Sequence, residues 1–154
     1  MAGLVFLKDL VFQVLIALRA IWAPTAFGVV GAVFDDQGRV LLVKHRYNAG
    51  WQLPGGGVGR GEAPEIALLR ELGEEVGLAG GTTRLFGLYT RKAGWVTNVV
   101  ALYRVSAAQV NFRPNLEIRE ICLVMPGQPP ADCTPATLRR LKELDGEQAL
   151  SLCW

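Results

Sequence analysis

The segment from Gly56 to Leu78 constrains the fold of this chain more than any other part of the sequence. It reads GGVGRGEAPEIALLRELGEEVGL, a glycine-rich loop followed by a segment with helical periodicity. Its apolar stripe consists of Ile66, Ala67, Leu69 and Leu72. Pro64 suits the first turn of a helix, and Gly77 suits the left-handed position just past its end. The pattern therefore predicts a tight loop that leads into a helix over Pro64–Val76.

Three carboxylates share one face of this predicted helix. If Glu71 is set at zero, Glu74 falls at about 300° and Glu75 at about 40°, so the three occupy an arc of about 100°. Acids this close repel one another unless a cation joins them. Carboxylate oxygens in this number suit a hard ion such as Mg²⁺ or Mn²⁺, which typically serves phosphoryl chemistry in proteins.

A simpler interpretation is a solvated acidic helix face, on which Arg70 and Glu74 form an ion pair one turn apart. The glycines that precede the helix favour a functional site instead. They free the backbone to turn sharply beside the acidic helix and to approach a phosphate closely.

The spacing of these residues matches the Nudix box, G-x5-E-x7-R-E-U-x-E-E-x-G-U, where U is a bulky aliphatic residue. The fixed positions are filled by Gly56, Glu62, Arg70, Glu71, Leu72, Glu74, Glu75, Gly77 and Leu78. The upstream WQLPGG and the segment before it also resemble the family, so the likeness extends over about Phe27–Met125. The chain is thus similar to MutT-like Nudix hydrolases.

This resemblance implies an α/β fold, the Nudix-type α/β/α sandwich with a mixed β-sheet. It also implies a metal-dependent hydrolase that cleaves a pyrophosphate bond in a nucleoside diphosphate linked to another moiety, by attack of water on phosphorus. Nucleoside triphosphates and nucleotide sugars are favoured, because no long insertion indicates a specialised pocket. The alternative is a catalytically silent Nudix-like domain that binds a nucleotide as a sensor.

The resemblance assigns roles to residues of the box. Metal ligands, for Mg²⁺ or else Mn²⁺, would be Gly56, through its backbone, and Glu71, Glu74 and Glu75. Glu71 is also a candidate for the base that helps to deprotonate the attacking water. Arg70 would orient a glutamate through an ion pair, and Glu62 would be the partner of that arginine or a water-mediated metal contact. Gly73, at a free position of the box, should cost roughly 1 kcal/mol relative to alanine.

Family members often recruit a further acid from outside the box. Glu120, at the start of a predicted strand over Glu120–Met125, is the first choice in this sequence, and Glu117 is the second. The alternative for each is an ordinary surface charge.

Candidate substrate contacts lie outside the box as well. Gly56 and Arg46 are placed to contact phosphates, and Tyr47 and Trp95 are the aromatic residues best placed to stack on a base. Arg91 and Lys92 are either phosphate contacts or the solvated end of a strand. His45, the only histidine, is more typical of a core position than of a general base.

The rest of the chain is predicted to form one domain over residues 24–154, preceded by a helix within residues 1–23. Strands are expected over Phe27–Phe34, Arg39–His45, Trp51–Leu53, Arg84–Thr90 and Val96–Val105, and a last helix over Thr134–Leu144. The first two strands are expected to form a β-hairpin around the turn at residues 35–38.

The N-terminal helix is nearly continuously apolar from Gly3 to Trp22. Lys8, Asp9, Gln13 and Arg19 gather on one side of it, which indicates an amphipathic helix. Its apolar face must be covered by its own domain, by a second subunit as a homodimer, or by a membrane surface. The charges inside the run count against a helix that crosses a bilayer. A membrane surface is the least favoured cover for the apolar face, because few basic residues line the polar side.

Charge and cysteine content limit the other partners. The 154 residues include 16 basic and 14 acidic side chains, and this net charge of +2 gives no reason to expect nucleic acid as a partner. The expected partner is a small nucleotide. Three cysteines without metal-binding spacing indicate neither a disulfide framework nor a zinc site, which is typical of the cytoplasm.

Overall fold

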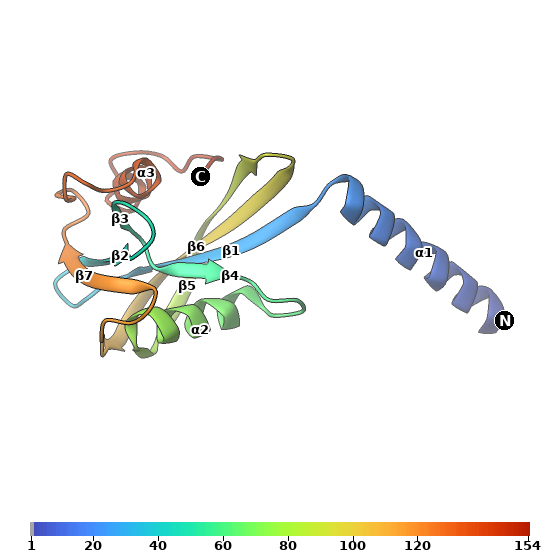
Figure 1. The fold of residues 1–154 in the computed structure, drawn as a ribbon, viewed down its shortest axis with the longest axis horizontal. Helices are drawn as coiled ribbons and strands as arrows, with labels where there is room; N and C mark the ends of the chain where they lie inside the picture. The colour runs from blue at the N-terminus through green and yellow to red at the C-terminus, as the bar shows by residue number, and fades with distance from the viewer. Residues whose placement is uncertain (1) are drawn as a thin grey trace.

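The computed structural model describes the backbone of residues 2–154 and the side chains from residue 10 onward. In chain order the elements are α1 (Ala2–Trp22), β1 (Thr25–Val33), β2 (Val40–His45), β3 (Trp51–Gln52), β4 (Gly55–Gly57), α2 (Pro64–Val76), β5 (Leu78–Ala93), β6 (Val96–Val110), β7 (Ile118–Val124) and α3 (Pro135–Leu144). Figure 1 shows α2 on one side of the strands and α3 on the other.

The strands form two sheets. One has the order β4-β1-β6-β5, in which β1 and β6 are parallel and the other neighbours antiparallel. The second is antiparallel, with the order β3-β2-β7. Helices on both sides of a mixed sheet confirm the α/β/α arrangement that the sequence predicts.

The predicted β-hairpin of the first two strands is wrong beyond its turn. The turn itself forms, because the backbone NH of Asp35 donates to the carbonyl of Arg39 at 3.0 Å and the two side chains form an ion pair at 2.7 Å. The strands then separate, so that β1 becomes central in one sheet and β2 central in the other. Both strands are rich in fully buried side chains, and a strand that is apolar on both faces is stable in the middle of a sheet.

A close contact between Gly31 of β1 and Leu72 of α2 sets the position of the box helix. A side chain at Gly31 would have its Cβ 2.9 Å from a methyl carbon of Leu72. Leu68 and Leu72 are fully buried in the core cluster beneath α2. A second cluster, which includes Tyr89 and Leu141, lies beneath α3. The glycine lets the helix approach the sheet and so fixes which helical face stays free for the site.

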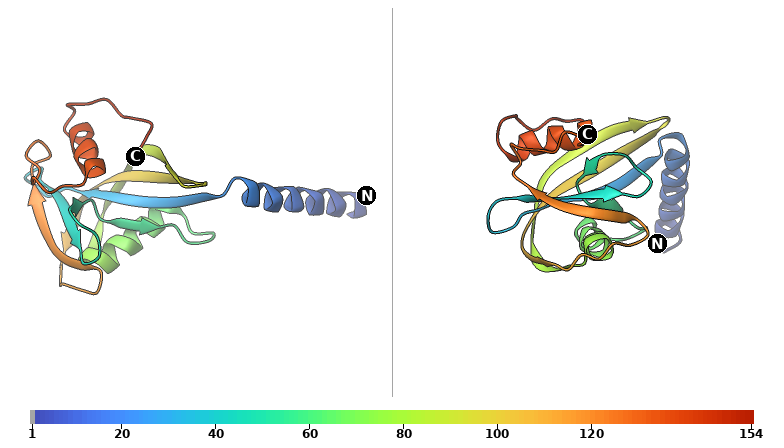
Figure 2. Two further views of the ribbon diagram at one scale, coloured as in Figure 1. Left: turned by 45° about the horizontal axis from the view of Figure 1, so that its top comes forward. Right: turned by 60° about the vertical axis from the view of Figure 1, so that its left-hand side comes forward.

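Helix α1 projects away from the domain (Figures 1 and 2). The large apolar side chains of its described part are exposed, namely Leu10, Val11, Phe12, Val14, Leu15, Ile16, Leu18, Ile21 and Trp22. The domain therefore does not cover this helix, which removes one of the three predicted ways to bury it. The side chains of Lys8 and Asp9, part of the predicted polar side, lie outside the described residues. Within residues 2–154, none of the helices combines the length and apolar character needed to cross a bilayer.

Candidate active site

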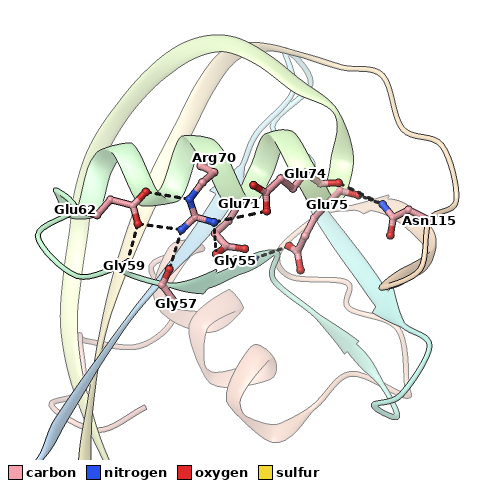
Figure 3. Close-up of polar contacts among 9 residues, drawn as sticks. All are labelled: Gly55, Gly57, Gly59, Glu62, Arg70, Glu71, Glu74, Glu75 and Asn115. Carbon is pink, nitrogen blue, oxygen red and sulfur yellow. Dashed lines mark hydrogen bonds and ion pairs between the residues drawn. The ribbon is translucent and has the colours of Figure 1, made fainter.

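Helix α2 occupies the residues predicted for it, Pro64–Val76. Pro64 is at its first turn, and Gly77 ends it in the left-handed conformation with φ of 64° and an NH that donates back to Gly73. The glycine loop before the helix forms the short strand β4, in which Gly56 pairs with Val29 of β1. The acidic residues of α2 and the backbone of β4 thus face each other (Figure 3).

Arg70 connects the loop and the helix (Figure 3). Its guanidinium donates two hydrogen bonds of 3.0 Å to the two carboxylate oxygens of Glu62. It donates a third, of 2.7 Å, to Glu71, and a fourth, of 3.1 Å, to the carbonyl of Gly57. The pairing of Arg70 with Glu62, which the family resemblance implies, is thus present in the structure. The planar fork of arginine suits this role, because one side chain fixes several acceptors at once.

The carboxylate of Glu62 is also bound by the loop. The backbone NH of Gly59 donates to it at 2.8 Å. The hydrogen bonds from Arg70 and from Gly59 lower the pKa of Glu62 to about 2. Glu62 is therefore ionised at neutral pH, and its bonds tie the glycine loop to Arg70 of α2.

Glu75 is the buried acid of the site. Its residue is 4% exposed, and its carboxylate accepts a hydrogen bond of 2.8 Å from the backbone NH of Gly55. Burial, together with the negative charges of Glu71, Glu117 and Glu74, raises the pKa of Glu75 to about 7, against the lowering effect of the hydrogen bond from Gly55. An acid in this environment gains from any nearby positive charge.

The chemistry of these donors fits a divalent cation. Glu71 lies directly against Gly56, Glu75 is buried close to the charges of Glu71 and Glu74, and carboxylate and backbone oxygens are the preferred ligands of Mg²⁺ and Mn²⁺. Among the side chains of residues 10–154, no three acidic, histidine or cysteine groups already converge as a metal-binding group. The side chain of Glu74 is 64% exposed, and its carboxylate lies 3.6 Å from the guanidinium of Arg70.

The two acids predicted outside the box occupy different environments. Glu120 faces two cations, with its carboxylate 2.7 Å from the guanidinium of Arg119 and 3.9 Å from the ammonium of Lys44. Glu117 is close enough to Glu75 that its charge raises the pKa of that residue. The structure therefore brings Glu117, the second choice, toward the acidic cluster, and places Glu120 in a surface ion-pair network.

A cavity of about 620 Å³ begins at Gly55 and Gly56. Its walls come from β1, β4, the ends of β5 and β6, the first turns of α3 and the C-terminal residue, and its polar or charged lining residues are His45, Asn48, Gln52, Arg91, Asn98, Thr134, Thr137, Arg139 and Trp154. A volume in this range suits one nucleotide-sized ligand. The predicted phosphate contact Gly56 is one of the lining residues.

The remaining predicted contacts lie outside this cavity. Arg46 and Tyr47 line a neighbouring hollow that shares His45 with the cavity. Trp95 is 77% exposed at the turn between β5 and β6 and lines neither the cavity nor the hollow. The structure thus gives no support to stacking by Trp95.

Comparison with known families agrees with this geometry. A family model, described as the NUDIX domain, matches residues 23–143. This chain belongs to the Nudix family.

Several relatives of this Nudix protein carry functional names. An RNA pyrophosphohydrolase of Hydrogenovibrio crunogenus is 38% identical over 65 residues, which are 42% of this chain and 38% of that protein. A MutT-like protein of Streptomyces ambofaciens is 38% identical over 61 residues, 40% of each protein. The chain thus spans about two fifths of the length of these relatives. A solved structure, a MutT NUDIX hydrolase from Burkholderia pseudomallei, is 26% identical with a TM-score of 0.67, and covers 77% of this chain and 96% of that one.

No local pattern in the sequence predicts part of the cavity lining in this Nudix protein. Asn98, Arg139 and Trp154 were not expected at a site, because they lie on β6, on α3 and at the C-terminus and meet only in the folded chain. Arg91, considered as a phosphate contact, does line the cavity. Its partner in the β5–β6 register is Asn98, so both side chains lie on one sheet face.

Proposed function

We propose that this protein hydrolyses a pyrophosphate bond in a nucleoside diphosphate linked to another moiety, with Mg²⁺ or Mn²⁺ as cofactor. The names of its relatives, RNA pyrophosphohydrolase and MutT-like protein, support this reaction class. The complete box and the cavity beside it support it independently. A nucleoside triphosphate or a nucleotide sugar is the proposed substrate type.

The observation that carries the proposal is the contact of Glu71 with both Arg70 and Gly56. Arg70 holds the Glu71 carboxylate directly against the β4 backbone at Gly56, a residue that lines the cavity. A carboxylate fixed in this way serves both as a ligand and as an acceptor for the proton of an attacking water. Acids positioned beside a nucleotide-sized cavity suit the hydrolysis of a pyrophosphate bond.

The proposed cation ligands are the backbone oxygen of Gly56 and the carboxylates of Glu71, Glu74 and Glu75, with Glu117 preferred over Glu120 as the acid from outside the box. When bound, the cation neutralises phosphate charge and lowers the pKa of a bound water. Arg70 and Glu62 position Glu71 and keep the glycine loop closed against α2. The cavity residues hold the rest of the nucleotide.

The test is a hydrolysis assay with identified products. The purified chain is incubated with Mg²⁺ or Mn²⁺ and a panel of nucleoside triphosphates, nucleotide sugars, dinucleotides and 5′-triphosphorylated RNA, and the products are separated and weighed by mass spectrometry. Cleavage at a phosphorus, seen as ¹⁸O from labelled water in a phosphorylated product, supports the proposal. The absence of any cleavage across the panel contradicts it.

The rival function is a silent nucleotide sensor. All the glutamates of the box are present, and loss of activity is expected to leave some of them substituted. Calorimetry on the same panel, with metal present, distinguishes the two functions. A nucleotide that binds but is not hydrolysed would show that the protein is a sensor. The cytoplasmic location and the small-nucleotide partner remain predictions.

A further inference from the structure

Asn115 connects the end of helix α2 to the loop that carries Glu117. Its side-chain amide donates to the backbone carbonyls of Glu75, at 3.1 Å, and of Glu74, at 3.4 Å (Figure 3). Both carbonyls belong to the last turn of α2, where backbone oxygens lack partners within the helix. One side chain from the loop therefore bonds to the backbone of two residues whose carboxylates are proposed metal ligands.

The same side chain also fixes the loop itself. The side-chain oxygen of Asn115 accepts hydrogen bonds from the backbone NH of Ile118, at 2.7 Å, and of Glu117, at 3.0 Å. Asparagine commonly forms such a turn with the backbone two residues further on. The backbone of Glu117 is thus held relative to Asn115 and, through the amide of Asn115, relative to α2.

Two further contacts hold this loop from the side of the sheet. The backbone NH of Arg46, which follows β2, donates to the carbonyl of Glu117 at 2.9 Å. The guanidinium of Arg46 donates to the backbone carbonyl of Asn115 at 2.6 Å. Ile118, the first residue of β7, is fully buried. The position of Glu117 is therefore fixed from α2, from β2 and from β7.

The charge of Glu117 acts on the acids of the box. Burial and the charge of Glu71 raise the pKa of Glu75, and the charge of Glu117 raises it as well. Among the side chains of residues 10–154, no lysine, arginine or histidine forms an ion pair with Glu117. Glu117 is exposed, so an ion that arrives from solvent reaches its carboxylate. Glu120, in contrast, already faces Arg119 and Lys44.

From these contacts, and on the basis of the proposed function, we infer that Asn115 is a positioning residue of the metal site. It holds Glu117 next to the end of α2, so that the helix and the loop present their carboxylates to the same cation. A loop that had to become ordered when the ion binds would lower the affinity for that ion. The amide of Asn115 orders the loop in advance, and partners of this kind are often worth tenfold or more in metal affinity.

The test measures Mn²⁺ binding to the full chain without nucleotide, so that it does not depend on turnover. Mn²⁺ is titrated into the protein, and the free ion is followed by electron paramagnetic resonance. Asn115→Ala should weaken Mn²⁺ binding by about tenfold. Asn111→Ala, at the other end of the same loop, is the matched control, because Asn111 bonds to Gly77 through its backbone. Its Mn²⁺ affinity should equal that of the wild type.

A double-mutant cycle separates positioning of Glu117 from simple capping of α2. Glu117→Gln alone should weaken Mn²⁺ binding. Addition of Asn115→Ala to Glu117→Gln should cause little further loss, because Asn115 acts through Glu117. A residue that only caps the helix would cause the same loss in both backgrounds. Circular dichroism checks folding. Should Asn115→Ala not fold, Asn115→Ser replaces it, since serine can bond the NH groups of the loop but is too short to reach α2.

The outcomes distinguish this inference from the proposed function. Wild-type Mn²⁺ affinity in the folded Asn115 variant, or an equal further loss in the Glu117→Gln background, overturns the inference and leaves the proposed function intact. A wild-type chain that shows the dependence on Asn115 but cleaves nothing in the substrate panel refutes the proposed function alone. A wild-type chain that binds no Mn²⁺ contradicts both.

Discussion

The carboxylate of Glu71 occupies the space that a side chain at Gly56 would need. A Cβ built on Gly56 would lie closer to all three terminal atoms of Glu71 than any van der Waals contact allows. This contact brings helix α2 and strand β4 together beside the cavity that Gly56 lines. It also explains in physical terms why the first fixed position of the box is a glycine.

Gly56→Ala should therefore displace Glu71 and reduce kcat by about 100-fold, since a shift of about 1 Å in a catalytic group has effects of this size. Gly57→Ala is the matched control, because a Cβ at Gly57 meets no atom within 4 Å. Steady-state kinetics on the best substrate of the panel measures both variants. Equal losses of kcat in the two variants would show that any added side chain on β4 lowers the rate, and that the contact with Glu71 is not the cause.

Arg70→Lys should lower kcat by about 10-fold to 100-fold, the usual effect of losing a residue that orients a ligand. Lysine keeps the charge but cannot bond Glu62, Glu71 and the Gly57 carbonyl together. Arg60→Lys, an exposed change in the same loop, is the control. Steady-state kinetics measures kcat for both variants, and circular dichroism spectra like that of the wild type show that both are folded. A kcat for Arg70→Lys equal to that of the wild type would show that Arg70 is not needed to position Glu71.

Glu75→Gln should abolish turnover and also abolish stabilisation by metal. A ligand that binds only the folded chain raises its stability by about 2.7 kcal/mol at roughly 100 times Kd. Thermal unfolding with and without MgCl₂ should thus show a metal-dependent rise in Tm for the wild type and none for the variant. Glutamine still accepts the hydrogen bond from Gly55, and it removes a buried charge that Glu71 and Glu117 repel. The metal-free variant should therefore be at least as stable as the metal-free wild type.

Glu74→Gln provides a second test of the same acids. Its side chain is largely exposed, so the substitution should leave metal-free stability unchanged and still abolish turnover. Full activity in both glutamine variants would contradict the assignment of the acids to a metal.

Local signals in the sequence were enough to predict both helices of the domain. α2 begins at Pro64 and ends at Gly77, and α3 begins after its cap Thr134, because proline, glycine and capping residues act within one turn of the chain. The pairing of Arg70 with Glu62 is one of the two roles that the family resemblance implies for Glu62, and the structure contains it.

The strand pairings and the cavity could not be predicted in the same way. β4 consists of three glycines, which give no pattern of side chains, and it forms through backbone pairing with β1. The sequence favoured pairing of the first two strands, but each is central in a different sheet. Arg139 and Trp154 reach the cavity only through the packing of α3 and of the tail, where Trp154 bonds to Thr90 of β5. Such contacts depend on tertiary structure and not on local propensity.

Gly73→Ala should stabilise the domain by roughly 1 kcal/mol. The position is within α2, its φ is not positive, and the nearest atom to an added Cβ is the carbonyl oxygen of Leu78 at 3.8 Å, an ordinary contact. Gly77→Ala is the contrasting variant, because Gly77 has φ of 64° and a Cβ there would collide with Asn111. Urea unfolding should show a gain for the first and a loss for the second. A loss in both would indicate that α2 does not tolerate the extra methyl group.

The exposed α1 leads to the last prediction, that two or more copies associate through it. Between residues 10 and 22, Gln13 and Arg19 are the only polar residues, and apolar side chains extend around the whole helix. An apolar surface of this extent marks a site that another surface covers. Light scattering should give a multiple of the chain mass of 16.7 kDa, and Leu18→Glu or removal of residues 1–22 should reduce it to one copy. Leu116→Glu, at a 93% exposed leucine outside α1, should leave the mass unchanged. A single copy for the full chain, or cosedimentation with lipid vesicles in place of self-association, would contradict the prediction.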